Sequence, residues 1–238
     1  MIRFFALNAF IAVHTILFCV WGFFVSFFDQ NGRLVHFYAA VPWAKMILRV
    51  CGVKVKVSGL ENVGRDVPYV YMTNHQSYFD IFALLAFIPS DFKFILKQEL
   101  MKIPIFGFSM RKAGYIAIDR EDPRRAVRSL NDAARRIKNG ASVVIFPEGT
   151  RSLDGTLQSF RPGGFHLALK SGCDIVPVAI AGSHRIVPKG SLKIKKGSFA
   201  LSLGKPISVE PYSKKDMERL MNRVREAMLE QISRQPLS

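Results

Sequence analysis

The N-terminus limits what this chain can fold into, because residues 4–28, FFALNAFIAVHTILFCVWGFFVSFF, contain no charged side chain. As an α-helix the stretch reaches roughly 37 Å, which exceeds the roughly 30 Å hydrocarbon core of a bilayer. The apolar region of a signal peptide is usually only about 7 to 15 residues long and ends at a small-residue cleavage site, and this stretch has neither property. The sequence therefore predicts a retained membrane segment.

Basic residues are distributed unevenly around this segment. Arg33, Lys45 and Arg49 follow it, whereas only Arg3 precedes it. Because positive residues favour the cytosolic side of a membrane, we expect the remainder of the chain to face the cytosol, at the inner membrane if the protein is bacterial. A helix that crosses the bilayer and one held in a single leaflet both satisfy this pattern.

Residues 34–53 form a second apolar stretch, which is interrupted by Lys45 and Arg49. These charges argue against a simple second span. They favour an interfacial or re-entrant helix paired with the first helix. The alternative is a helix packed on a globular core.

The overall charge indicates an anionic partner. The chain has 34 Lys and Arg against 18 Asp and Glu, a net charge of +16, so it should attract phospholipid headgroups, phosphorylated metabolites, an acidic carrier protein or nucleic acid. A hydrophobic content of 49% favours a membrane over a polynucleotide. The three cysteines are widely spaced and odd in number, which predicts reduced thiols rather than disulfides or a zinc site.

Beyond Gly59 the pattern alternates between strands and helices, which predicts an α/β domain over residues 58–238 after N-terminal apolar helices over residues 1–57. A C-terminal helix should open at Ser213, with Asp216 completing a capping box. We expect strands at residues 68–73, 114–118, 142–146 and 174–180, hairpin-like strands within 192–207, and helices at 78–88 and from Pro123 to Asn139.

The segment NHQSYFD, residues 74–80, places His75 and Asp80 between an expected strand and an expected helix. Five residues along a helix is about 500°, so the two side chains meet only if the chain turns between them. Such a turn gives the arrangement of a general base and its orienting carboxylate. A structural histidine beside a helix-capping aspartate would have the same pattern.

A second polar segment, FPEGTRS, follows the expected strand at 142–146. Glu148, Gly149, Thr150 and Arg151 should therefore lie at the edge of the sheet that also carries His75, where open α/β sheets bind ligands. Gly149 permits close backbone approach, and Arg151 can grip a phosphate with two parallel hydrogen bonds. The alternative is a β-turn with a surface salt bridge.

Two further cations accompany these segments. Arg120, in GYIAIDR, also follows an expected strand, and Lys97 lies in ILKQEL. A lone lysine is more often simply solvated.

These segments resemble the motif blocks of the glycerolipid acyltransferases. NHQSYFD matches the NHxxxxD block, FPEGTRS matches the EGT-R block, and GYIAIDR and IVPVAI are similar to the intervening and the fourth block, in the family's order over most of residues 55–210. SFRPGGFHLA departs from the family, with Arg161 where lysine is common and PGG in place of KGA. The length and apolar N-terminus resemble the bacterial 1-acylglycerol-3-phosphate acyltransferases.

The resemblance implies a glycerolipid-acyltransferase-like domain, with a mixed sheet flanked by helices. It implies acyl transfer from acyl-CoA or acyl-carrier protein to the sn-2 hydroxyl of lysophosphatidic acid, giving phosphatidic acid. His75 would act as the base and Asp80 would orient it. Lys97, Arg120 and Arg151 would hold the phosphate, and Glu148, Gly149 and Thr150 would shape its site. No metal or cofactor is implied, because the thioester is already activated.

Several alternatives remain open. Glycerol 3-phosphate, another lysophospholipid and an amino-acid lipid are alternative acceptors, and water as acceptor would make a thioesterase. A non-enzymatic, membrane-tethered basic module is a rival of another class, although no helix-turn-helix, RNP or P-loop pattern is present and no nucleic acid is expected as partner. The basic residues should face an anionic leaflet or an acidic carrier protein: Arg124, Arg125, Arg128, Arg135, Arg136, Lys193, Lys195 and Lys196.

Overall fold

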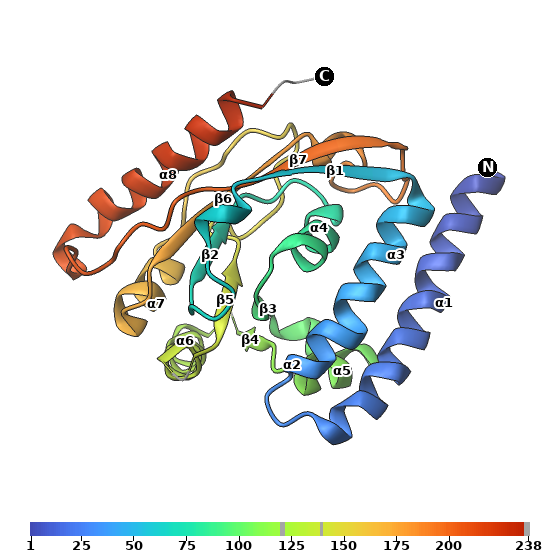
Figure 1. Ribbon diagram of the computed structural model, residues 1–238, viewed down its shortest axis with the longest axis horizontal. Coiled ribbons are helices and arrows are strands. Elements are labelled where there is room, and N and C mark those ends of the chain that lie inside the picture. Colours follow the sequence, from blue (N-terminus) through green and yellow to red (C-terminus); the bar gives the residue numbers. More distant parts are fainter. Residues whose placement is uncertain (120–121, 139, 236–238) are drawn as a thin grey trace.

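A mixed β-sheet organises the computed structural model of the protein, which describes residues 1–119, 122–138 and 140–235 (Figure 1). In this part of the chain the sheet has seven strands in the order β1-β7-β6-β2-β5-β3-β4. The strands are β1 (Val53–Ser58), β2 (Val70–Thr73), β3 (Phe92–Lys97), β4 (Ile116–Ile118), β5 (Ser142–Ile145), β6 (Ile175–Ala181) and β7 (Gly197–Leu203). The mixed sheet that the resemblance implied is confirmed.

Strand direction decides where the polar segments meet. Strands β6, β2, β5, β3 and β4 run parallel to one another, whereas β7 is antiparallel to β6 and parallel to β1. The carboxyl ends of the five parallel strands therefore lie at one edge of the sheet. The segments that follow β2 and β5, which begin at Asn74 and Phe146, leave the sheet at this edge.

Two apolar cores lie on opposite faces of the sheet, because alternate residues of each strand point to opposite sides. Tyr71 belongs to the core on one face, and Val70 and Met72 belong to the core on the other. Helices α3 (Val41–Cys51) and α4 (Phe79–Phe87) cover the first face. Helices α6 (Pro123–Lys138), α7 (Gly163–Ser171) and α8 (Met217–Ser233) cover the second (Figure 1).

The N-terminal residues form two packed helical segments. The first is α1 (Ile2–Val25), and the second runs from Arg33 to Cys51 as α2 (Arg33–Val35), a π-helical turn (His36–Ala40) and α3. Gly22 allows close approach, because a Cβ atom there would lie 3.4 Å from Cβ of Ala39. Trp43 Nε1 donates a hydrogen bond to Thr15 Oγ1 at 3.1 Å. The two segments therefore pair, as expected from the sequence.

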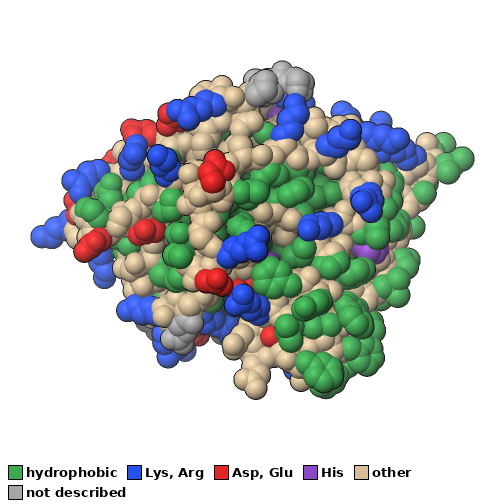
Figure 2. Space-filling view, in the orientation of Figure 1, with side chains coloured by type: hydrophobic (Ala, Val, Ile, Leu, Met, Phe, Trp, Pro, Cys, Tyr) green, Lys and Arg blue, Asp and Glu red, His purple; other side chains and the backbone are tan. Residues whose placement is uncertain are grey.

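Both segments are long and apolar enough to cross a membrane. Exposed large side chains such as Phe5, Leu17 and Phe28 occur along α1 and its end, and Figure 2 shows hydrophobic side chains along the side that α1 occupies. This surface suits membrane association. The second segment also buries Ala44 and Ile47 in the core against α4, so it pairs with α1 and packs on the globular core at once.

Other sequence predictions had mixed outcomes. The hairpin within residues 192–207 was wrong: one strand, β7, forms there, and it pairs with β1 and β6. Strand β1 joins the sheet and crosses the domain boundary expected at residues 57 and 58. The capping box of Ser213 and Asp216 is confirmed and precedes α8. The remaining short elements are α5 (Phe106–Lys112) and 3₁₀ turns at Ser26–Phe28, Leu60–Asn62, Gln98–Lys102, Ser183–Arg185 and Lys214–Asp216.

We predict that a side chain at Gly59, directly after β1, destabilises the protein for steric reasons. Its φ is +78°, and a Cβ atom would lie 1.9 Å from the carbonyl oxygen of Leu203. Gly172 has a similar φ of +71°, yet nothing lies within 4 Å of its Cβ position. Gly172→Ala should cost about 1–2 kcal/mol for the left-handed conformation alone. Gly59→Ala should cost about 1–3 kcal/mol more, since the β7 backbone must shift.

Thermal unfolding of the two detergent-solubilised variants measures this difference. Equal losses of melting temperature would contradict the prediction.

Candidate active site

The turn between β2 and α4 brings His75 and Asp80 together. His75 Nδ1 lies 2.8 Å from Asp80 Oδ2, so the contact expected from their spacing is present. The same oxygen accepts hydrogen bonds from the backbone N–H groups of Gln76 (2.7 Å) and Ser77 (2.8 Å). The Asp80 side chain is fully buried, and the His75 side chain is 16% exposed. One carboxylate therefore shapes the turn and holds the imidazole.

This contact favours one tautomer of the neutral imidazole. An ionised carboxylate only accepts hydrogen bonds, so a neutral ring beside it carries its proton on Nδ1 and presents the lone pair of Nε2. The ring of Phe146, from the segment after β5, stacks on the imidazole with centroids 4.0 Å apart. His75 lines a large cavity, so its ring is positioned to act on a molecule bound there.

Glu148 ties the two motif segments together. Its Oε1 accepts a hydrogen bond from the backbone N–H of His75 at 2.7 Å, and its Oε2 accepts one from the N–H of Gln158 at 3.0 Å. Burial raises the pKa of the Glu148 carboxyl, and the two N–H donors offset part of that rise. The carboxylate thus positions the backbone of His75.

Gln76 is a positioning residue that the sequence did not reveal. Its Nε2 donates hydrogen bonds of 2.9 Å to the carbonyl oxygens of Gly155 and Ile180. Its Oε1 accepts from Gly182 N–H at 3.2 Å and lies 3.2 Å from His184 Nδ1. All of these partners lie far along the chain. The only sequence signal was an amide side chain at the end of a buried strand, where polar groups need partners.

Asn74 extends the pairing of β2 with β6. Its Nδ2 donates to the carbonyl oxygen of Ile180 at 2.8 Å, and its Oδ1 accepts from the N–H of the same residue at 2.7 Å. The side chain thereby replaces backbone partners where β2 ends. Both residues that flank His75 are thus fixed to the β6 side of the sheet.

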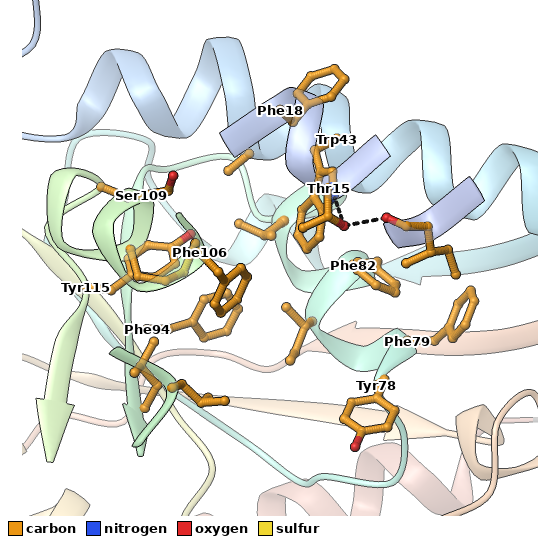
Figure 3. Close-up of a pocket in the computed structure, with 18 of the residues that line it drawn as sticks. Thr15, Phe18, Trp43, Tyr78, Phe79, Phe82, Phe94, Phe106, Ser109 and Tyr115 are labelled. Carbon is orange, nitrogen blue, oxygen red and sulfur yellow. Dashed lines mark hydrogen bonds between the residues drawn. The ribbon is translucent and has the colours of Figure 1, made fainter. Parts of the chain in front are cut away.

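The cavity beside His75 has a volume of about 690 Å³ and a mainly apolar lining. In Figure 3, Tyr78 lies on one side of the cavity, and Ser109 and Tyr115 lie on the opposite side. Side chains of the N-terminal helices, including Thr15 and Trp43, form part of its wall. The apolar N-terminal segments are therefore part of the site.

Comparison with known proteins identifies the family of the chain. An acyltransferase family model matches residues 54–181, which is more than half of the sequence. The chain belongs to the acyltransferase family. This confirms the resemblance drawn from the motif segments.

Relatives within the family carry related names. The chain is 41% identical over 186 residues to the chloroplastic 1-acyl-sn-glycerol-3-phosphate acyltransferase LPAT1 of Arabidopsis thaliana, covering 77% of this chain and 52% of that protein. It is 31% identical over 233 residues to a 1-acyl-sn-glycerol-3-phosphate acyltransferase of Chlamydomonas reinhardtii, covering 91% and 68%. The chain thus spans about half the length of the chloroplastic Arabidopsis relative.

A solved structure is similar over the whole chain. It is the crystal structure of the 1-acyl-sn-glycerophosphate (LPA) acyltransferase PlsC from Thermotoga maritima, with a TM-score of 0.83 and 27% identity. The similarity covers 100% of this chain and 99% of that chain, so it includes the two N-terminal helical segments.

The EGT-R block of this acyltransferase adds cations to the cavity wall. The Arg151 guanidinium stacks on the ring of Tyr78, 3.8 Å from its centroid, and its buried Nη1 has no hydrogen-bond partner among the described residues. Thr150 Oγ1 accepts a hydrogen bond of 3.2 Å from Nζ of Lys189, a cation that the sequence reading missed. Arg161 lies against Gly149, since a Cβ atom there would be 3.0 Å from Arg161 Nε.

Four of the other site residues predicted from the sequence line the cavity, and one lies outside the described residues. Gly149, Thr150, Arg151 and Lys97 line the same cavity as His75. Lys97 also forms an ion pair of 3.0 Å with Glu99, in which both side chains are about half exposed. Such a pair is weak and leaves the ammonium available. Arg120 lies outside the described residues.

We predict that Gln76→Glu lowers both stability and turnover. A glutamate has the same shape but donates no hydrogen bond when ionised. The carbonyl oxygen of Gly155 then loses the hydrogen bond from this side chain, and that of Ile180 keeps the one from Asn74 Nδ2. A hydrogen bond lost in this way should cost about 1–3 kcal/mol. Thermal unfolding and steady-state acyl transfer measure the two effects.

The matched control is Gln30→Glu, at an exposed glutamine in the loop between α1 and α2. If Gln76→Glu were as stable and active as this control, Gln76 would not position the turn.

Proposed function

We propose that the protein transfers a fatty acyl group from an acyl thioester to the sn-2 hydroxyl of 1-acylglycerol 3-phosphate, giving phosphatidic acid. One observation carries the proposal: His75 lines the large cavity, and Asp80 Oδ2 lies 2.8 Å from its Nδ1, while Nε2 has no hydrogen-bond partner among the described residues. Membership of the acyltransferase family supports it, as do the names of the relatives.

The dyad performs the proton transfers of this reaction. Nε2 of His75 takes the proton of the acceptor hydroxyl as its oxygen attacks the thioester carbonyl. The tetrahedral intermediate then breaks its carbon–sulfur bond, and the leaving thiolate takes the proton from the imidazolium. Asp80 stabilises the imidazolium between these steps, as a carboxylate beside a catalytic histidine does. The donor carbonyl is already activated as a thioester, so the proposal needs no metal or cofactor.

Cations beside the dyad suit the acceptor phosphate. Arg151 offers a guanidinium group whose Nη1 has no hydrogen-bond partner among the described residues. Lys97 lines the same cavity, and Lys189 donates a hydrogen bond to Thr150, which also lines it. Guanidinium and ammonium groups form strong, charge-assisted hydrogen bonds with phosphate oxygens. Arg120 retains the phosphate-binding role that the family resemblance implies. A phosphomonoester acceptor is therefore favoured over an uncharged alcohol.

The apolar cavity suits a fatty acyl chain. It is bounded by α1, α3, α4 and α5, and two of these helices belong to the segments suited to a membrane. A lipid acceptor can enter directly from the leaflet that receives them. We place the catalytic domain on the cytosolic face, where the excess basic residues meet an anionic leaflet. The donor is acyl-CoA or acyl-carrier protein.

The test is acyl transfer to 1-acylglycerol 3-phosphate by the detergent-purified protein and by His75→Ala. Loss of the general base should lower turnover by about 10²–10⁴-fold. His166→Ala, an exposed histidine on α7, is the matched control and should retain wild-type turnover. Phosphatidic acid and free thiol are followed together, with oleoyl-CoA and oleoyl-carrier protein as separate donors.

Each alternative outcome has a distinct signature. Turnover of His75→Ala within a few-fold of wild type would contradict the mechanism. Histidine-dependent thiol release without phosphatidic acid would contradict the acceptor and indicate another alcohol or water. An absence of turnover from folded protein, together with salt-dependent lipid or DNA binding, would favour a non-enzymatic basic module.

A further inference from the structure

A second hollow, of about 610 Å³, lies beside the active site and has a different lining. We call it the basic groove. Its cations are Arg185, Lys195 and Lys196, all exposed, and within the described part of the chain none of them forms an ion pair. Figure 2 shows Lys and Arg side chains gathered where β7 begins beside the N-terminus of α1. The groove therefore presents uncompensated positive charge.

The charges of the groove come from these lysine and arginine side chains. Burial and the nearby Arg185 lower the pKa of His184, so its ring is neutral near pH 7. Asp154 is an acid close to His184, but it does not line the groove, and its carboxylate accepts hydrogen bonds from Ser152 and Thr156. A hollow with charges of one sign concentrates counter-ions, so its natural occupant carries several negative charges.

Apolar side chains line the groove together with the cations. Leu153, Ile186 and Pro188 also line the groove, and Leu153 is 73% exposed. This combination matches a nucleotide, which has phosphate groups for the cations and a flat base for the apolar surface. The volume lies within the range of small-molecule sites, roughly 300–1,000 Å³, and the concave shape suits a small molecule better than the surface of a protein or a leaflet.

The residues around Pro188, which we call the ridge, lie between the basic groove and the cavity that contains His75. Pro188 lines the groove, and the preceding residue, Val187, lines the cavity. The next residue, Lys189, donates its hydrogen bond to Thr150, which also lines the cavity. His184 also lines the groove, and its Nδ1 lies 3.2 Å from Oε1 of Gln76, the residue that follows His75. A ligand with a long flexible arm can therefore place its charged end in the groove and its reactive end at His75.

We propose that the basic groove binds the nucleotide end of acyl-CoA, with its diphosphate and 3′-phosphate on Arg185, Lys195 and Lys196. This rests on the proposed acyl transfer. The carrier-protein form of the donor has a single phosphodiester at the corresponding place, which leaves most of the positive charge unmatched. The pantetheine arm crosses the ridge, and the thioester reaches His75 beside the apolar cavity.

The test compares two double variants with the same change of charge. Lys195→Gln/Lys196→Gln removes two cations from the groove, and Lys214→Gln/Lys215→Gln removes two exposed lysines before α8. The groove variant should raise KM for oleoyl-CoA about tenfold or more, with KM for 1-acylglycerol 3-phosphate and kcat little changed. The control should stay within about twofold of wild type. Arg185→Gln alone should raise the same KM.

Binding of a probe without acyl chain or arm separates this inference from the proposed function. Adenosine 3′,5′-bisphosphate should bind wild type in equilibrium dialysis and compete with oleoyl-CoA, and its affinity should fall in the groove variant. Wild-type phosphatidic acid synthesis with an unchanged oleoyl-CoA KM in the groove variant would overturn the groove alone. If the wild-type protein turned over neither donor, the proposed function would be overturned, whether or not adenosine 3′,5′-bisphosphate binds.

Two other results would also overturn the proposal that the basic groove binds the nucleotide of acyl-CoA. A raised KM for oleoyl-carrier protein without any change for oleoyl-CoA would make the groove a docking surface for the carrier protein. Loss of flotation with phosphatidylglycerol-containing vesicles, at unchanged oleoyl-CoA KM in detergent, would make it a leaflet contact.

Discussion

The structure of the site depends on one buried carboxylate. Asp80 Oδ2 receives the His75 ring N–H and the backbone N–H groups of Gln76 and Ser77. A buried carboxylate is strongly destabilising unless such donors surround it, so the chain must turn where these N–H groups converge. The same requirement that shapes the exit of β2 also orients the imidazole. The position of His75 is therefore a consequence of folding, and so is the tautomer expected for its neutral ring.

Long-range contacts then place this turn against the rest of the molecule. Glu148 fixes the His75 backbone to the segment after β5, and Gln76 fixes it to the segments around Gly155 and Ile180. All of these segments leave the sheet at one edge, because β2, β5 and β6 are parallel. The N-terminal helices complete the cavity, so the same two helical segments provide both the surface suited to a membrane and part of the cavity wall.

The sequence predicted what is local and missed what is distant. The contact of His75 with Asp80 was predictable, since five residues and one turn separate them. The pairing of β7 was not, because its partner β1 lies more than a hundred residues away and its own sequence reads as a hairpin. The hydrogen bonds of Gln76 and Lys189 join segments whose proximity depends on the complete sheet. Thr150 and Arg151 were expected at this edge of the sheet because they follow a strand, and they line the cavity there.

The central claim is that Asp80 keeps the proton of neutral His75 on Nδ1 and leaves Nε2 free as a base. Nitrogen NMR of protein labelled in its histidine rings tests this most directly, with the His75 signals assigned by their loss in His75→Gln. The account predicts the Nδ1–H tautomer at a pH where the ring is neutral, and a mixed or Nε2–H form in Asp80→Ala. An Nε2–H tautomer in the wild-type protein would contradict it.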